Sequence, residues 1–170
     1  MAVLATDSAH DPDGGAARRP APRLTGVTTV RWAPTTELPA ATLYAVMRLR
    51  QDVFVLEQQC LYPDLDGRDL EPGTVQWWAE DASGAVVGTL RVLDDGDDGL
   101  RIGRVATARS ARGGGVARRL VEDALAATEG PVVLDAQAHL AGWYAALGFE
   151  VTGDEFLDDG IPHVPMRLDR

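Results

Sequence analysis

The segment from Arg112 to Gly115 has the composition of an anion-binding loop. Its three consecutive glycines let the backbone turn N–H groups towards a ligand without steric cost. A helix expected to begin near Val116 adds free N–H groups and the positive end of its dipole, and Arg118 and Arg119 add charge. This segment therefore suits a phosphate or pyrophosphate. From these residues alone, a flexible surface loop ahead of a helix is equally compatible.

Two common nucleotide-binding motifs do not fit this segment. A P-loop needs a lysine after its last glycine, and none follows here. In the dinucleotide fingerprint, Gly113 and Gly115 match the first two glycines. Asp135 follows at about the separation in sequence expected of the acidic residue that contacts the ribose. However, Arg118 occupies the third glycine position, and the preceding strands are expected to form a meander. The segment is therefore not interpreted as a P-loop or as a dinucleotide-binding motif.

Hydrophobic periodicity places the glycine segment between a strand and a helix. Apolar residues at three- and four-residue spacing predict helices at residues 39–54, 116–128 and 140–147. Alternating or continuous apolar runs predict strands at residues 27–32, 75–80, 85–93, 100–107, 132–134, 149–152 and 163–168. Thr35 or Thr36 is the expected N-cap of the first helix, and Gly148 ends the last one. The order indicates an α+β fold around a mixed sheet.

Length and composition favour one domain at residues 27–170, preceded by a flexible tail at residues 1–26. The tail is rich in Ala, Pro, Gly and Asp and shows no hydrophobic period. No apolar run approaches the roughly 20 residues that span a bilayer, and no secretion signal is expected. Cys60 is the only cysteine, so no internal disulfide forms, and a reducing cytoplasm fits. A monomer and a homodimer are both compatible with these properties.

The formal net charge of −10 bears on the choice of partner. A nucleic-acid ligand is not expected, because binding a polyanion relies on a basic surface. An acidic surface could instead attract a cationic substrate. It also keeps a protein soluble without any such role, and the composition leaves this alternative open.

Two motifs resemble those of the GNAT superfamily of N-acetyltransferases. The pattern Arg112-x-x-Gly115-x-Ala117, after a strand and before a helix, is similar to its pyrophosphate motif. The run from Trp143 to Phe149, an aromatic-Tyr pair followed by Gly-Phe, resembles its second hallmark. The chain resembles the ElaA-like branch more closely still, through runs in matching order at residues 53–58, 64–67, 102–105, 136–140 and 159–163. The resemblance covers residues 43–166.

The resemblance implies a mixed, mostly antiparallel central sheet flanked by helices, with a V-shaped splay between two parallel strands. Those strands would be residues 100–107 and 132–136, and acetyl-CoA would lie between them as co-substrate. Its pantetheine arm would pair with the backbone of Val105, Ala106 and Thr107 as an added strand pairs with a sheet edge. Gln137 falls where many relatives carry an amide that touches this arm. The expected pyrophosphate-binding residues are Arg112, Gly113, Gly114, Gly115, Val116, Ala117 and Arg118.

Tyr144 is the expected general acid, because the matching tyrosine in relatives lies near the thioester sulfur. A phenol of pKa about 10 can protonate a departing thiolate of pKa about 8.5 in a suitable site. Without the resemblance, Tyr144 would be interpreted as a core aromatic beside Trp143 and Phe149.

The general base is less determined by the sequence. Many relatives use a glutamate on the strand at residues 100–107, where this chain has Arg101 and Arg104. His163 is one candidate, because histidine exchanges protons near neutral pH. Glu57, at the end of the first helix, is another, and a chain of water molecules is a third.

Other polar and aromatic residues are expected to have structural roles. Asp64, Asp66 and Asp69 lack the register of a calcium-binding loop, so they are interpreted as solvated turn acids. No metal site is expected. Trp77 and Trp78 should point to opposite faces of a strand, one into the core and the other a candidate for the acceptor side.

These features predict an N-acetyltransferase that moves an acetyl group from acetyl-CoA to a primary amine by direct attack in a ternary complex. The amine is a small molecule or a peptide. The alternative is a non-catalytic module that binds acyl-CoA as a sensor. An S-adenosylmethionine methyltransferase is disfavoured, because its glycine motif should follow the first strand.

Overall fold

The computed structural model describes residues 28–170, so the tail expected at residues 1–26 lies outside the described residues. The described chain forms one sheet with strand order β1-β2-β3-β4-β5-β8-β6, and β7 pairs with β8. All pairs are antiparallel except β4 with β5. The strands are β1 (Thr29–Pro34), β2 (Val75–Glu80), β3 (Val86–Asp94), β4 (Leu100–Thr107), β5 (Val132–Gln137), β6 (Glu150–Val151), β7 (Phe156–Asp158) and β8 (Ile161–Leu168).

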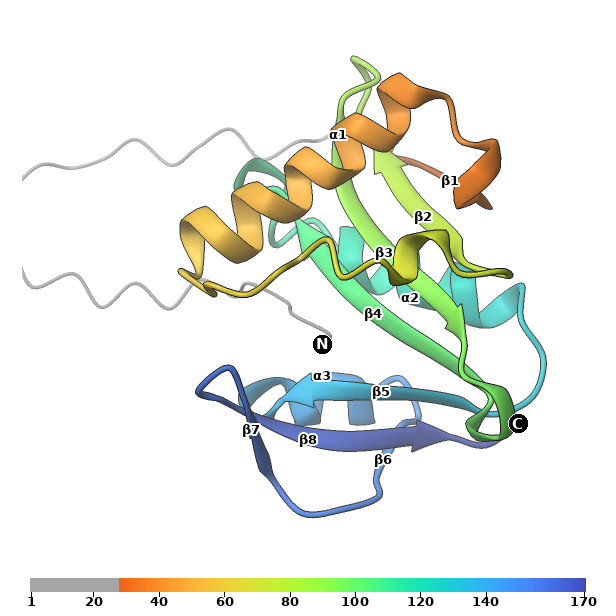
Figure 1. Ribbon diagram of the computed structural model, residues 1–170, viewed down its shortest axis with the longest axis vertical. Helices are drawn as coiled ribbons and strands as arrows, with labels where there is room; N and C mark the ends of the chain where they lie inside the picture. Colours follow the sequence, from red (N-terminus) through yellow and green to blue (C-terminus); the bar gives the residue numbers. More distant parts are fainter. Residues whose placement is uncertain (1–27) are drawn as a thin grey trace, which may run out of the picture.

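Helices cover both faces of this sheet (Figure 1). One face, here called the α1 face, carries α1 (Ala40–Arg50) and the π-helical segment Gln51–Glu57 that continues it. The opposite α2 face carries α2 (Val116–Ala126) and α3 (Ala141–Ala145). The mixed, mostly antiparallel sheet with flanking helices is therefore confirmed.

Alternation along the strands divides the core between the two faces. Trp77 packs on the α2 face with the apolar side of α2, and Trp78 packs on the α1 face with Leu38 and Val46. The expectation that only one tryptophan lies in the core is wrong, because helices cover both faces. Thr35 is also not the expected cap of α1: Pro39 precedes the helix, and Thr35 is buried, where it accepts a hydrogen bond from Gln76.

The parallel pair β4–β5 is joined over only two residues of each strand. Leu100 pairs with Val132 and Arg101 with Val133, after which the two strands separate. Each stays paired on its other side, β4 with β3 as far as Thr107 and β5 with β8 as far as Gln137. Figure 1 shows the strands close at one end and apart at the other. This confirms the V-shaped splay.

A β-bulge lies in β4 where the strands separate. Between two paired positions, β4 contributes Arg104 and Val105 opposite the single residue Leu90 of β3. Arg104 has a φ of 54°, a left-handed conformation that only a few per cent of non-glycine residues adopt. A bulge of this kind bends its strand and increases the local twist. The bulge thus lies just beyond Arg101, the last residue of β4 that pairs with β5.

Candidate active site

The glycine loop joins β4 to α2 as the sequence predicts. Gly113 and Gly115 have φ values of 74° and 79°, which favour glycine, and Gly115 is the N-cap of α2. No side chain caps this helix, so the N–H groups of Val116 to Arg118 lack intrahelical acceptors. The glycines are exposed. The loop therefore offers uncapped N–H groups and a helix dipole to an anion.

Two predicted site residues, Arg112 and Glu57, form an ion pair with each other. Both terminal nitrogens of Arg112 donate to the Glu57 carboxylate, one of them at 2.6 Å, and its Nε donates to the Thr107 carbonyl at 3.2 Å. The hydrogen bond from Arg112 lowers the pKa of Glu57 although partial burial opposes it. Arg112 thus holds the end of β4, the end of the π-helical segment and the start of the glycine loop together.

The edge of β4 that faces β5 has no partner strand beyond Arg101. Val105 points into the core on the α2 face, and Ala106 packs on the α1 face. The buried hydroxyl of Thr107 has no hydrogen-bond partner among the described residues. This stretch of backbone leads directly to the glycine loop. An extended ligand with an anionic end fits the path.

Tyr144 reaches the α2 face from α3 and is fully buried. Its ring makes edge contacts with Trp143 and Phe149, at centroid distances of 4.7 and 5.9 Å. Its hydroxyl has no hydrogen-bond partner within residues 28–170. Burial raises the pKa of Tyr144 well above that of a free phenol, so the group stays protonated. An unpaired buried hydroxyl costs roughly 1–3 kcal/mol, a cost that a reacting ligand would offset.

His163 and Gln137 lie opposite each other on β8 and β5, with their side chains on the α1 face. His163 is fully buried beside Phe156. Its Nδ1 lies 2.8 Å from the carbonyl of Ile161, which can only accept, so Nδ1 carries the proton. Nε2 has no partner among the described residues. A neutral imidazole protonated at Nδ1 would present the lone pair of Nε2 to a substrate, as a general base requires.

Two of the three aspartates interpreted as solvated turn acids, Asp64 and Asp69, are instead buried in an ion-pair network, whereas Asp66 is exposed and joins the network at its edge. Arg50, with no exposed surface, bonds Asp64 at 2.9 Å and Asp69 at 2.7 Å. Arg91 bonds Asp66 at 2.8 Å and Asp69 at 3.1 Å. For Asp64 and Asp69 the expectation was wrong because the neutralising arginines come from distant elements, α1, β3 and β4.

Tyr144 of α3 and His163 of β8, two of the predicted catalytic residues, lie on opposite faces of the sheet. Tyr144 belongs to the α2 face together with the glycine loop, whereas His163 belongs to the α1 face. Glu57 is tied to the glycine loop through Arg112. The arginines and aspartates of the α1 face were not predicted as site residues. The sequence did contain a signal for them, because arginines such as Arg91 and Arg104 occur within strands that are otherwise apolar.

The sequence is similar to those of known acetyltransferases. An acetyltransferase (GNAT) domain matches residues 50–170. A UPF0039 protein of Mycobacterium tuberculosis is 50% identical over 139 residues, covering 79% of this chain and 88% of the relative. Protein ElaA of Escherichia coli is 37% identical over 139 residues, covering 76% of this chain and 89% of the relative.

Solved structures show the same similarity. An acyl-CoA N-acyltransferase from Pseudomonas aeruginosa superimposes with a TM-score of 0.79 and 37% identity, covering 84% of this chain and 99% of that one. Escherichia coli ElaA superimposes with a TM-score of 0.78 and 33% identity, covering 84% and 100%. Within residues 28–170 no helix is long and apolar enough to cross a membrane.

Proposed function

This chain belongs to the GNAT family of acetyltransferases, and we propose that it transfers an acetyl group from acetyl-CoA to a primary amine by direct attack in a ternary complex. The reaction joins the amine nitrogen to the thioester carbonyl carbon and breaks the carbon–sulfur bond. The amine must lose protons, and the thiolate must gain one. The chain therefore has to supply an anion site, an extended groove, a base and an acid.

The observation that carries the proposal is the unpaired edge of β4, which ends at an uncapped helix N-terminus. The backbone of Val105 to Thr107 would pair with the pantetheine arm as a sheet edge pairs with a strand. The amides from Gly113 to Arg118 would hold the pyrophosphate. Arg112 would position this loop through its bonds to Glu57 and Thr107, and Gln137 would offer an amide to the arm.

Tyr144 is the proposed acid. Burial raises its pKa, but the same water-poor surroundings make a departing thiolate a stronger base. Its neutral hydroxyl has no competing partner among the described residues and is free to donate to sulfur.

His163 is the proposed base. Its Nε2 has no hydrogen-bond partner among the described residues, and its side chain lies on the face opposite to that of Tyr144. Glu57 is the weaker candidate, because its ion pair with Arg112 lowers its pKa and occupies both oxygens.

The test is acetyl-CoA binding, followed calorimetrically, together with release of free CoA thiol in the presence of a panel of amines. Gly115→Asp places a negative charge at the N-terminus of α2, so we expect acetyl-CoA affinity to fall at least about 10-fold. Gly84→Asp is the matched control, because Gly84 is also exposed, with a φ of 82° and open space around its missing side chain.

The outcomes separate the enzyme from its alternative. Equal affinities in the Gly115→Asp and Gly84→Asp variants would place the pyrophosphate elsewhere. Tight acetyl-CoA binding without CoA release for any amine would favour the sensor module.

A further inference from the structure

A charged pocket of about 380 Å³ opens on the α1 face of the sheet, beside the splay. Its lining includes four arginines, Arg68, Arg91, Arg101 and Arg104, and three aspartates. The arginines outnumber the aspartates of the lining by one, and Arg91 and Arg104 also pair with Asp69 and Asp64 behind it. Four guanidinium groups gathered in one concave site favour an anionic group on the ligand where they keep free donors.

The aspartates of this pocket are already neutralised. Asp66 bonds Arg91 and Arg104, Asp95 bonds Arg68 and Arg101, and Asp135 bonds Arg101 at 2.6 Å. The hydrogen bonds of Arg101 use its Nε and Nη1, and those of Arg104 use its Nε and Nη2. One terminal nitrogen of each therefore has no partner among the described residues.

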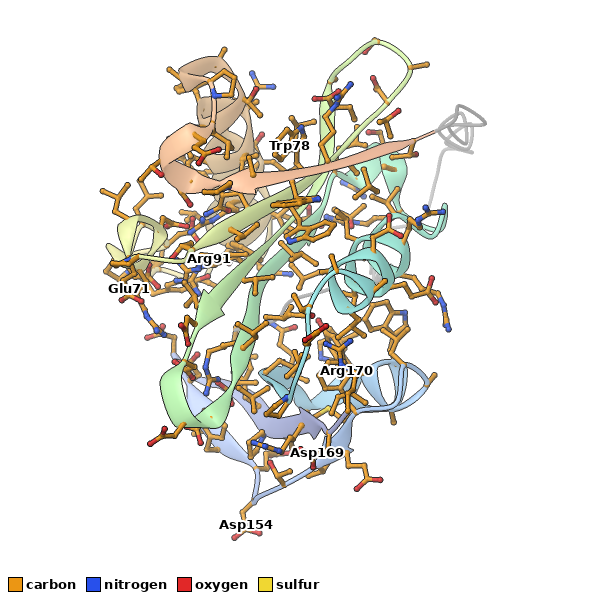
Figure 2. All side chains as sticks on the ribbon, turned by 90° about the vertical axis from the view of Figure 1, so that its right-hand side faces the viewer. Glu71, Trp78, Arg91, Asp154, Asp169 and Arg170 are labelled. Carbon is orange, nitrogen blue, oxygen red and sulfur yellow. The ribbon has the colours of Figure 1, made fainter. Side chains whose placement is uncertain are left out.

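Arg91 forms part of the floor of this pocket, with both terminal nitrogens bonded to Asp66. Its side chain lines the pocket, yet the residue is only 3% exposed, and its Nε lacks a partner within residues 28–170. Figure 2 shows Arg91 on the side of the sheet away from α2, near the segment that carries Glu71. Guanidinium groups with free donors match the planar geometry of a carboxylate.

The pocket lies where the acceptor amine is needed. Arg101, Gly103 and Arg104 come from β4, and Asp135 comes from β5, so the lining bridges both strands of the splay. An arm that begins at the glycine loop and follows Thr107 to Val105 points its thioester end towards Arg104. The side chain of His163 lies on the same face. A ligand held by Arg101 and Arg104 would thus face the thioester.

We infer that the acceptor is a small molecule carrying both a primary amine and a carboxylate, as an amino acid does, and that Arg101 and Arg104 bind the carboxylate. This inference rests on the proposed acetyl transfer. The ammonium nitrogen loses a proton to solvent, attacks the thioester carbonyl and gives a second proton to His163. Tyr144 protonates the sulfur as the carbon–sulfur bond breaks, and the proton on His163 then returns through solvent to Tyr144. The products are an N-acetyl amino acid, CoA thiol and the one proton lost to solvent.

The experiment measures CoA thiol release with the twenty standard L-amino acids. The best amino acid is then compared with its own amide and its decarboxylated amine, with spermidine as a purely cationic acceptor. Charge-assisted hydrogen bonds to a carboxylate predict a kcat/KM for the amino acid roughly 10–100-fold above that for either neutralised analogue. Equal or better use of the analogues or of spermidine would overturn the inference.

Arg101→Gln tests the assigned residue. We expect KM for the amino acid to rise at least about 10-fold, while KM for acetyl-CoA and kcat/KM for the decarboxylated amine stay within about twofold. Arg31→Gln is the matched control, because the exposed Arg31 of β1 forms an ion pair with Glu80 of β2. An unchanged amino acid KM in Arg101→Gln would contradict the assignment. A purely structural role of Arg101 would lower activity with both acceptors alike.

Calorimetric binding of the amino acid and of its amide to the wild-type protein separates the two proposals. If no amine releases CoA, the proposed function fails, and preferential binding of the amino acid still supports the pocket assignment. If CoA is released but the amide binds as tightly as the amino acid, only the pocket assignment fails.

Discussion

At the scale of single residues, the molecule contains buried polar atoms that its own fold does not satisfy. The Tyr144 hydroxyl and His163 Nε2 are both in this state within residues 28–170. An unmet donor or acceptor in the interior destabilises the folded chain. Both atoms belong to residues proposed to move protons. Removing either atom should therefore raise the stability of the protein and lower its turnover.

Tyr144→Phe should therefore stabilise the protein and inactivate it. Removing an unpaired buried hydroxyl should raise the free energy of unfolding by about 1 kcal/mol, or roughly 2–4 °C in Tm. Loss of the acid should lower kcat by about 100-fold or more with acetyl-CoA affinity nearly unchanged. Calorimetric melting and CoA release measure the two effects.

Tyr44→Phe provides the control for that substitution, because Tyr44 is 71% exposed on α1. A Tyr144→Phe variant that melts at a lower temperature than the wild type would show that the hydroxyl is a structural donor. Full turnover in this variant would remove Tyr144 from the chemistry.

At the scale of elements, the position of the glycine loop depends on how closely α2 packs on β3. Gly88 of β3 lies under the start of α2, and a Cβ atom there would lie 2.5 Å from Cγ1 of Val116 and 3.0 Å from Cδ1 of Leu120. Val116 is the first residue of α2, directly after Gly115. A glycine in β3 thus sets the place of the proposed pyrophosphate site.

Gly88→Ala should displace the N-terminus of α2. Overpacking costs roughly 1–3 kcal/mol, so we expect a lower free energy of unfolding together with weaker acetyl-CoA binding. Adding Val116→Ala removes the obstructing methyl group, and the double variant should regain part of both losses. Denaturant unfolding and calorimetry measure these effects, and strictly additive losses in the double variant would contradict the packing argument.

The positions of most helices and strands were predictable from the sequence, but the π-helical stretch after α1 and the short strand β7 were not. Periodicity located α2 and the strands that flank the glycine loop, and the resemblance supplied the splay, which no pattern within a single strand encodes. The π-helical stretch Gln51–Glu57 was missed because its apolar spacing is that of an α-helix. Strand β7 was missed because it has only three residues, although the Asp159-Gly160 turn beside it favours a hairpin.

The candidate site divides in the same way. The glycine loop was predictable because the role of glycines before a helix depends only on residues that are neighbours in the sequence. The charged pocket was not, because it requires Arg101 and Asp135 to meet across strands that pair at only two positions. Nor does composition distinguish a solvated acid from Asp69, whose partner Arg50 lies 19 residues away.

At the scale of the whole molecule, the network of Arg50, Arg91, Asp66 and Asp69 ties α1 and β3 to the loop that carries the two acids. Burial acts to raise the pKa of Asp69, but its hydrogen bond to Arg50 and the charges of Arg50 and Arg91 outweigh it and lower the pKa. Burial likewise opposes the lowering of the Asp66 pKa by Arg91 and Arg104. Both groups are therefore more acidic in the folded chain than in the unfolded one.

This difference predicts instability in acid. The stabilisation is fully present above the unfolded pKa of about 3.9 and is lost as pH falls through the lower folded values. Tm should therefore drop steeply below about pH 4. Asp69→Asn should cost about 3–5 kcal/mol, because it leaves Arg50 buried with one charge fewer to pair with, and should flatten the acid limb.

Melting curves between pH 2 and pH 7 test this prediction. Asp154→Asn is the matched control, because Asp154 is exposed in the loop before β7, away from the network (Figure 2). An unchanged acid slope in Asp69→Asn would show that other groups govern acid unfolding.

The short seam between β4 and β5 also has a consequence for self-association. Beyond Arg101 and Val133 the sheet has two interior edges, and unpaired edges are templates on which another chain can add a strand. The features that limit this hazard are the shortness of β5, six residues long, and the bulge at Arg104, which twists the edge of β4. The opening that would admit a substrate is thus also where aggregation would begin, and straightening the bulge would expose the chain to it.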